Sequence, residues 1–268
     1  MTRRTTFDRG EGRRLFGHDP ETYDRVRPGH PDAVYEILRD RCGLGIGSKV
    51  LEIGPGTGQA SRRLLDYGAG PLVGVEPDPR LARFLRESIG DRIEVLESTL
   101  EDAGLGTDFD LAAAASSFHW VEEALGLAKL RDALRPGGWI ALWWSSFGDE
   151  KQPHPFLQAT DTLYEDLPCG PSGPSGLGLS FARDSENRLR ALADAGFEQG
   201  THDDVHWSNE WDSEGIRGLY STYSPIASLE PVRRADLLAA VERIAATQFG
   251  GRVVLPLATS LYTGRKPS

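Results

Sequence analysis

Short apolar segments alternate with segments of helical period between residues 49 and 144, and this alternation restricts the possible folds more than any other feature of the chain. The strand-like segments read KVLEIG, PLVGVE, IEVLE, FDLAAAA and WIALWW. The helices predicted between them cover residues 59–67, 79–89 and about 127–134. Parallel strands joined by right-handed helical crossovers predict an α/β fold with a doubly wound, Rossmann-like sheet.

Further elements are predicted on both sides of this core. Residues 30–42 carry apolar side chains at helical spacing and lead into the first strand. The remaining patterns predict helices over residues 156–167, near 189–195 and from 231 to about 245, and strands over 197–207 and 253–262. Residues 168–180 are almost all Gly, Pro and Ser, a composition typical of lids and mobile linkers.

The charge balance narrows the class of partner. Lys and Arg number 30 against 40 Asp and Glu, a formal net charge of −10, whereas nucleic-acid binding depends on excess positive charge. We therefore expect no nucleic-acid partner. Two cysteines are too few for a disulfide framework, which fits a reducing compartment. No signal peptide and no apolar run long enough to span a bilayer is visible, so the sequence predicts a cytoplasmic protein without membrane contact.

A glycine-rich loop follows the first predicted strand. The chain reads GPGTG over residues 54–58, and a helix begins at Gln59. Glycines at the carboxyl end of a strand in a doubly wound sheet let backbone amides approach a cofactor closely. Glu76 ends the second strand, where a carboxylate can accept both hydroxyls of a ribose. The pattern indicates an adenosine-containing ligand, although the glycines alone also fit a tight strand-to-helix turn.

The charge in front of this loop distinguishes between adenosine cofactors. Dinucleotide sites place a pyrophosphate at the helix N-terminus, and an extra carboxylate there would repel it. Glu52 lies just before the loop, and the glycine spacing is the shortened Gly-x-Gly-x-Gly. A carboxylate suits a ligand with a cationic amino group, which describes S-adenosylmethionine. A NAD(P)-dependent oxidoreductase is the alternative that this charge disfavours.

Four segments resemble the successive motifs of class I S-adenosylmethionine-dependent methyltransferases. They read LEIGPGTG, GVEPD, FDLAAAASSFHWV and LRPGGWIALWW, and the likeness is best over residues 18–145. FGHDPETYDRVRPGHP, TLEDAG and SSFHWV are similar to the small-molecule branch that includes trans-aconitate methyltransferase. The resemblance implies a seven-stranded sheet with an antiparallel last strand, which the C-terminal strands would complete.

The resemblance also implies which residues bind the cofactor. Glu52 would face the methionyl end, and Glu76 would hold the ribose hydroxyls. Many relatives place Asp where Thr99 aligns, so Glu101, Asp102 or a backbone carbonyl would meet the adenine amino group. For Tyr23 and Arg27, which match a pair that closes over the methionine carboxylate, ordinary helix packing is an almost equal alternative. The expected cofactor-binding residues are Tyr23, Arg27, Glu52, Gly54, Gly56, Gly58, Gln59, Glu76, Pro77, Thr99, Leu100, Glu101 and Ser116.

The methyl acceptor is expected beside the end of the fourth strand, where the chain reads SSFHW over residues 116–120. His119 could deprotonate a hydroxyl or an amine, and Trp120 could form a wall of the pocket, so both are expected catalytic residues. The alternative is that His119 only hydrogen-bonds the loop backbone. A carboxylate acceptor would need no base, and an arginine such as Arg27 or Arg183 would then be the residue to test. No metal is expected.

The sequence therefore predicts a class I methyltransferase that acts on O, N or carboxylate of a small organic molecule. The expected organisation is a disordered arm over residues 1–16, a cofactor-binding core over 17–146, a helical lid and acceptor-binding insertion with part of the sheet over 147–230, and a C-terminal helix and last strand over 231–268. A non-catalytic S-adenosylmethionine-binding protein is a second alternative, because its glycine loop would read the same. The sequence predicts neither the acceptor's identity nor the oligomeric state.

Overall fold

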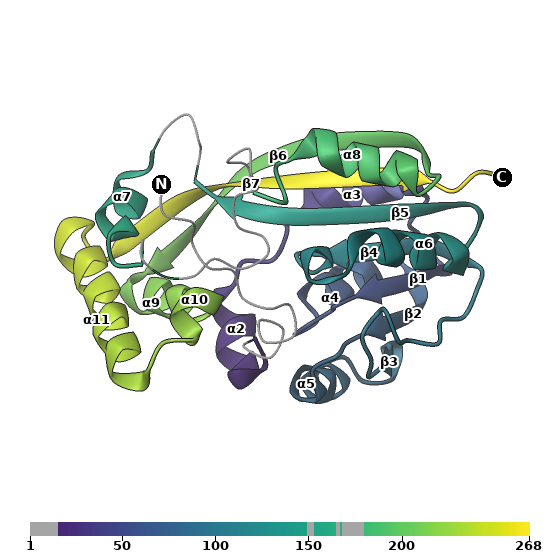
Figure 1. Ribbon diagram of the computed structural model, residues 1–268. Helices are drawn as coiled ribbons and strands as arrows, with labels where there is room; N and C mark the ends of the chain where they lie inside the picture. Colours follow the sequence, from purple (N-terminus) through teal and green to yellow (C-terminus); the bar gives the residue numbers. More distant parts are fainter. Residues whose placement is uncertain (1–15, 149–152, 165–166, 168–179) are drawn as a thin grey trace. The chain divides into compact units, whose positions relative to one another are not determined.

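The computed structural model describes residues 16–148, 153–164, 167 and 180–268. The expected arm over residues 1–16 and the Gly-Pro-Ser segment over 168–180 thus lie almost entirely outside the described residues. The strands form a seven-stranded sheet with the order β3-β2-β1-β4-β5-β7-β6 (Figure 1). This arrangement confirms the predicted α/β class and the doubly wound strand order, in which β2 and β3 are added on one side of β1 and β4 and β5 on the other.

The strands are β1 (Ser48–Ile53), β2 (Ala69–Val75), β3 (Glu94–Leu96), β4 (Phe109–Ala115), β5 (Leu134–Phe147), β6 (Glu198–Asp212) and β7 (Arg252–Arg265). Strand β1 pairs in parallel with β2 and β4, β2 pairs in parallel with β3, and β4 with β5. The carboxyl ends of β1, β2 and β4 therefore share one edge of the sheet. Ligands of open α/β sheets bind at that edge.

The helices are α2 (Pro20–Val26), α3 (Asp32–Cys42), α4 (Gln59–Asp66), α5 (Pro79–Ile89), α6 (Glu123–Ala133), α7 (Pro155–Asp161), α8 (Ser185–Asp194), α9 (Ser213–Ser221), α10 (Ser224–Ala227) and α11 (Pro231–Gln248), with 3₁₀ turns η1 (Phe16–His18), η2 (Gly90–Arg92) and η3 (Phe118–Trp120). Asp78 caps α5, because its side chain accepts from the Arg80 N–H at 2.9 Å. The sequence patterns did not predict α2, α9 or α10. Helix α7 is shorter than the predicted helix over 156–167.

The chain divides into two compact units. The first comprises residues 1–28, 146–173 and 206–258, and the second comprises residues 29–145, 174–205 and 259–268. In the second unit, apolar residues of α3, α4 and α5 pack on one face of the sheet, and those of α6 and α8 pack on the other. This three-layer packing buries most of the parallel strands, whose side chains are apolar on both faces.

The first unit has its own core, built mainly from α9, α11 and β7, to which α2, α7 and β6 each add one buried side chain. Phe156 and Tyr220 meet edge to face with ring centroids 6.0 Å apart, and both side chains are fully buried. The Trp211 indole N–H donates to the Val26 carbonyl at 2.9 Å and so ties the end of α2 to this core. Aliphatic side chains make up most of this core, and the aromatic rings of Phe156, Trp211 and Tyr220 pack among them.

Strand β5 corrects one sequence prediction. Residues 135–138 were expected to form a turn before a strand over 139–144, but β5 already begins at Leu134. The register against β4 shifts between Phe109 and Leu111, so the extra residues form an irregularity within the strand. A Cβ at Gly138 would lie 3.0 Å from the Phe109 carbonyl oxygen. Gly138 therefore permits a close backbone approach that keeps the segment in the sheet.

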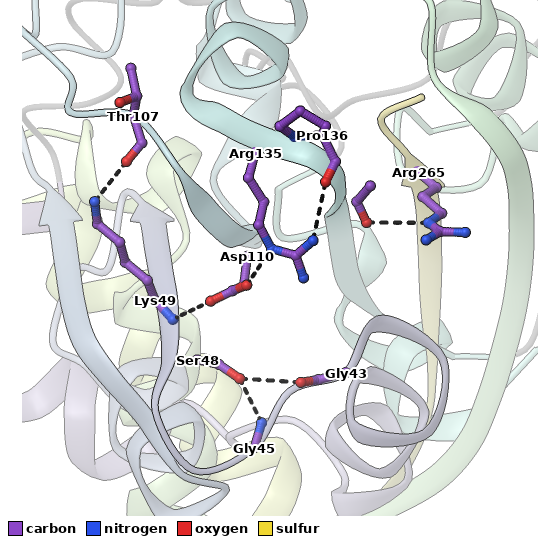
Figure 2. A network of polar contacts seen from close by, with 10 residues as sticks. Gly43, Gly45, Ser48, Lys49, Thr107, Asp110, Arg135, Pro136 and Arg265 are labelled. Atoms are coloured by element: carbon purple, nitrogen blue, oxygen red, sulfur yellow. Dashed lines mark hydrogen bonds and ion pairs between the residues drawn. The ribbon is translucent and has the colours of Figure 1, made fainter. Parts of the chain in front are cut away.

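A polar network closes the amino end of the sheet, opposite the predicted site (Figure 2). Asp110 accepts from the Lys49 N–H at 2.8 Å and from Arg135 Nε at 2.6 Å, and Lys49 Nζ donates to the Thr107 carbonyl at 2.6 Å. Partial burial alone would raise the pKa of Asp110, but the hydrogen bonds from Arg135 and Lys49 outweigh it and lower that pKa. The network joins the starts of β1, β4 and β5.

Candidate functional site

The glycine loop leads from β1 into α4 through three residues with positive φ: 62° at Gly54, 59° at Gly56 and 84° at Gly58. A Cβ at Gly58 would lie 2.7 Å from both Leu85 Cδ1 and Ile89 Cδ1, so a side chain there would have to displace the ends of these two side chains of α5. A Cβ at Gly56 would meet no atom of the described residues within 4 Å. The second glycine therefore borders open space, where a ligand can approach the backbone.

Glu52 lies in β1 directly behind this loop and is only 1% exposed. Its Oε2 accepts from the Ser61 hydroxyl at 2.6 Å, and its Oε1 has no hydrogen-bond partner among the described residues. Burial raises the pKa of Glu52 to about 7, opposed by the Ser61 hydrogen bond and reinforced by the negative charge of Glu76. A buried carboxylate oxygen without a partner is rare in folded proteins and indicates a missing cationic or donor group.

Glu76 follows β2 and is 3% exposed. Its Oε2 accepts from the Gly56 N–H at 3.0 Å and its Oε1 accepts from the Asp78 N–H at 3.0 Å. These bonds fix the carboxylate beside the second glycine. A carboxylate only accepts hydrogen bonds, which suits the hydroxyls of a diol. Gln59 is the first residue of α4, and Pro77 lies half-buried next to Glu76.

The segment after β3 holds the three residues expected near an adenine. Leu100 is 3% exposed, whereas Thr99 is half-buried. The Thr99 hydroxyl donates to Asp102 at 2.8 Å and accepts from the Asp102 N–H at 3.2 Å, so these two side chains hold each other. Glu101 accepts from the Glu122 N–H at 3.2 Å. That Glu101, Asp102 or a backbone carbonyl meets the adenine amino group stays a prediction.

The end of β4 turns sharply beside the glycine loop. Ser116 has a left-handed φ of 54° and donates its N–H to the Trp143 carbonyl at 2.7 Å. The Ser117 hydroxyl donates to the Ile53 carbonyl at the end of β1. A Cβ at Gly54 would lie 2.7 Å from Ser117 Cβ, so the first glycine allows this contact. The structure therefore brings residues 116–120 next to the glycine loop.

His119 and Trp120 follow in η3 and are 7% and 8% exposed. The Trp144 indole N–H donates to His119 Nδ1 at 3.0 Å, and the His119 and Trp120 rings lie 5.0 Å apart. Trp144 belongs to β5, as does Trp143, and both are buried on opposite faces of the sheet. Strand alternation predicts that at most one of these tryptophans faces the pocket, and it gives no sign of the bond to His119.

The sequence did not predict two further polar contacts in this unit: the bond from Ser61 to Glu52 and a chain of polar side chains that begins at His30. Ser61, which bonds Glu52, lies on the buried face of α4, where a polar residue among apolar ones was the available signal. His30 Nδ1 lies 3.0 Å from Ser145 Oγ, which in turn lies 2.8 Å from Thr259 Oγ1. The short polar chain from His30 to Thr259 could not be found from spacing, because its members come from three distant parts of the sequence.

Tyr23 and Arg27 belong to the first unit. Arg27 Nε donates to Thr222 Oγ1 at 2.8 Å, and its guanidinium carbon lies 5.4 Å and 5.0 Å from the ring centroids of Tyr23 and Tyr223. Burial raises the pKa of the Tyr223 hydroxyl. The role of Tyr23 and Arg27 toward the methionine carboxylate stays a prediction.

No group of three or more His, Cys, Asp or Glu side chains among the described residues is arranged to hold a metal ion. His202 instead stacks on Tyr262, with ring centroids 4.6 Å apart and 11° between the planes. No helix in the described part of the chain is long and apolar enough to cross a membrane.

Comparison with known proteins identifies the central part of the chain. A family model described as a methyltransferase domain matches residues 51–142, the segment that carries the glycine loop, Glu76 and His119. An uncharacterized methyltransferase of Mycobacterium tuberculosis is 29% identical over 131 residues, which are 49% of this chain and 52% of that protein. The chain thus matches about half the length of this relative. The predicted methyltransferase domain is confirmed over the matched segment, whereas the trans-aconitate branch stays a prediction.

Two solved structures show the same fold. A protein of Anaeromyxobacter dehalogenans, provisionally described as a type II methyltransferase, aligns with a TM-score of 0.62 at 21% identity, covering 90% of this chain and 99% of that one. Phosphoethanolamine N-methyltransferase 2 of Haemonchus contortus, in complex with phosphomonomethylethanolamine and S-adenosylhomocysteine, aligns with a TM-score of 0.58 at 12% identity, covering 94% of this chain and 58% of that one. At these identities the likeness concerns the fold alone.

Proposed function

We propose that this protein is an S-adenosylmethionine-dependent methyltransferase that acts on a small organic molecule at O, N or carboxylate. The observation that carries the proposal is the buried Glu52, whose Oε1 has no hydrogen-bond partner among the described residues and lies behind a glycine loop bordering open space. A cationic amino group would satisfy this oxygen, and the methionyl end of S-adenosylmethionine carries one. When bound, this cofactor would supply a methyl group on an activated sulfonium.

The residues of the second unit can be assigned roles toward this cofactor. Glu52 would bind the ammonium, Gly56 would leave room for the backbone to approach the ligand, and Glu76, held beside Gly56, would accept hydrogen bonds from the ribose hydroxyls. The adenine is expected near Pro77, Thr99, Leu100 and Glu101, with Gln59 and Ser116 completing the site. Tyr23 and Arg27 of the first unit are the proposed partners of the methionine carboxylate.

A small-molecule acceptor is supported by the fold neighbours. The Haemonchus enzyme binds phosphomonomethylethanolamine, so the fold itself accommodates an acceptor of that size. The negative charge of the chain disfavours a nucleic-acid acceptor. We propose a cytosolic location for this activity, since the chain has only two cysteines and Cys42 is free and buried.

Ligand-dependent thermal stability tests the proposal. A ligand that binds only the folded state at about 100 times its dissociation constant stabilises by about 2.7 kcal/mol, which raises the Tm of a chain of this size by roughly 5–10 °C. We expect this rise with S-adenosylhomocysteine and none with NADH at the same concentration. Mass spectrometry of what co-purifies with the protein is a second readout. A rise with NADH alone would overturn the proposal in favour of an oxidoreductase.

A non-catalytic binding protein would give the same thermal result. It is separated from an enzyme by incubating the protein with methyl-labelled S-adenosylmethionine and pools of small carboxylic acids, amines and phenols. Label transferred to an acid, amine or phenol supports the enzyme, whereas tight binding without transfer to any pool supports the binding protein.

A further inference from the structure

The contact between Trp144 and His119 determines which nitrogen of the His119 ring carries the proton. The indole N–H of Trp144 donates to Nδ1 of His119 at 3.0 Å. An indole nitrogen is a donor only, so Nδ1 of His119 must accept and carries no hydrogen in this contact. A neutral imidazole with a bare Nδ1 has its proton on Nε2 and donates from there.

The direction of the Trp144 indole is itself held by its neighbours. Phe181 meets it edge to face with ring centroids 5.4 Å apart, and Tyr262 lies 6.2 Å away at an angle of 61°. The Tyr262 hydroxyl donates to the Ala182 carbonyl at 2.8 Å, and its ring stacks on His202. Trp144 is 4% exposed. A ring enclosed in this way cannot turn its N–H from His119 without repacking the cluster.

Strand pairing explains why these two residues meet. Ala115 at the end of β4 pairs with Trp143 of β5, and the Ser116 N–H donates to the Trp143 carbonyl. The chain then turns through Ser117, whose hydroxyl reaches the end of β1, into η3. His119 thus lies in the segment beside the glycine loop and is bonded to Trp144 of β5.

We propose that Trp144 is a positioning residue that holds His119 in the tautomer protonated on Nε2, so that His119 donates a hydrogen bond to the methyl acceptor and does not remove a proton from it. The inference rests on the proposed function, because it takes the edge beside the glycine loop as the acceptor site. The acceptor class that fits is one whose reacting oxygen is already ionised at neutral pH, which is a carboxylate.

The chemistry of transfer favours this class. When a carboxylate oxygen forms the bond to the methyl carbon, the carbon–sulfur bond breaks, its electron pair stays on sulfur, and no proton is released. A hydroxyl or an ammonium would have to lose a proton to a base. His30, beside β5, is a poor substitute, because burial lowers its pKa to about 4 and its Nδ1 already bonds Ser145. A carboxyl group has a pKa of about 4 in water and needs no base.

Nitrogen-15 NMR of the histidine and tryptophan rings tests the tautomer in the intact protein and needs no acceptor. We expect a pyridine-type signal for His119 Nδ1, a pyrrole-type signal for Nε2, and a scalar coupling through the hydrogen bond from Trp144 Nε1. Trp144→Phe keeps an aromatic ring without the N–H, so a population with a hydrogen on Nδ1 should appear. A hydrogen on Nδ1 in the wild type, or an unchanged tautomer in Trp144→Phe, would overturn the proposal.

Trp143→Phe is the matched control. Trp143 is adjacent in sequence and fully buried, but it contacts Tyr35 and His30 on the other face of the sheet. Its variant should leave the His119 tautomer unchanged. If Trp144→Phe does not fold, the coupling in the wild type alone decides the question, since its absence with Nδ1 protonated contradicts the hydrogen bond.

Acetate and methylammonium, each added with S-adenosylhomocysteine, are the probes of acceptor class. We expect the His119 Nε2–H resonance to shift with acetate and to stay in place with methylammonium. A shift with methylammonium alone, or none with acetate, would overturn the carboxylate assignment. The cofactor proposal fails separately, if S-adenosylhomocysteine produces neither calorimetric heat nor a rise in Tm while the ring tautomer remains as stated.

Discussion

Glu76, the proposed partner of the ribose hydroxyls, is held in place by two backbone hydrogen bonds. The N–H groups of Gly56 and Asp78 hold its two oxygens, each at 3.0 Å, beside the second glycine. We expect Glu76→Gln to weaken S-adenosylhomocysteine binding by roughly ten- to a hundredfold, or about 1.5–3 kcal/mol, because an amide loses the charge and one of the two acceptors. Isothermal titration calorimetry measures this change.

Glu97→Gln is the control for this experiment. Glu97 is a half-exposed carboxylate that pairs with Arg86 at 3.0 Å on the outer side of α5. Its replacement should leave the affinity unchanged. An equal loss in both variants would mean that general charge, and not the placement of Glu76, determines binding.

At this scale the sequence predicts types of residue better than their partners. Glu52 and Glu76 could be found because each lies at the carboxyl end of a predicted strand, and strand ends are visible in the apolar pattern. Ser61 and Trp144 could not be assigned to Glu52 and His119, because those contacts depend on helix rotation, strand register and side-chain rotamers. The expectation that His119 acts as a base came from residue type alone.

The joint between β1 and α4 depends on glycine for two different reasons, and a pair of variants separates them. Gly58→Ala would place Cβ 2.7 Å from Leu85 and Ile89 at a φ of 84°, whereas Gly56→Ala at 59° meets only open space. We expect Gly58→Ala to lower the free energy of unfolding by about 2–4 kcal/mol, and Gly56→Ala by about 1–2 kcal/mol from backbone strain alone. Urea denaturation measures both changes.

Gly58→Ala should cost more stability than Gly56→Ala, but Gly56→Ala should cost more ligand affinity than Gly58→Ala. Gly56→Ala fills space that the cofactor is proposed to use, so its loss of S-adenosylhomocysteine affinity should exceed that of Gly58→Ala under conditions where both are folded. Equal stability losses, or an unimpaired affinity in Gly56→Ala, would contradict the distinction between packing and access.

Among the elements, those with strong periodicity or clear caps were predictable. Helix α5 begins at Pro79 after Asp78 and ends before Gly90, as its sequence indicates. Helices α9 and α10 were missed because they are short, and α9 contains two glycines that lower helix propensity. The early start of β5 was missed because Arg-Pro-Gly-Gly has the composition of a turn, while sheet pairing keeps it in the strand.

The buried Glu52 links the stability of the whole protein to pH. Burial raises its pKa from 4.5 to about 7, so the folded state binds the proton more tightly than the unfolded state between these values. Without a ligand, this term is fully present below about pH 4.5 and is lost as pH rises through 7. We expect it to contribute a slope of up to about 1.4 kcal/mol per pH unit between pH 5 and 7. Urea unfolding at several pH values measures the slope.

Glu52→Gln keeps the shape of the side chain and cannot ionise, so the difference in unfolding free energy between wild type and variant isolates this term. The variant should gain stability relative to wild type as pH rises from 5 to 8. A difference that stays constant over this range would mean that Glu52 titrates at the same pH in the folded and unfolded protein.

Ser116, with its left-handed φ of 54° at the end of β4, has a consequence for protein engineering. Glycine enters this conformation without steric cost and asparagine with little, whereas valine, isoleucine and threonine do not. Backbone geometry therefore limits which residue types are tolerated at position 116, and this limit does not depend on the methyl acceptor. Sequencing the folded fraction of a saturation library at residue 116 would reveal that restriction. Redesign of acceptor specificity is better directed at Trp120 and Phe181, which flank His119 without this constraint.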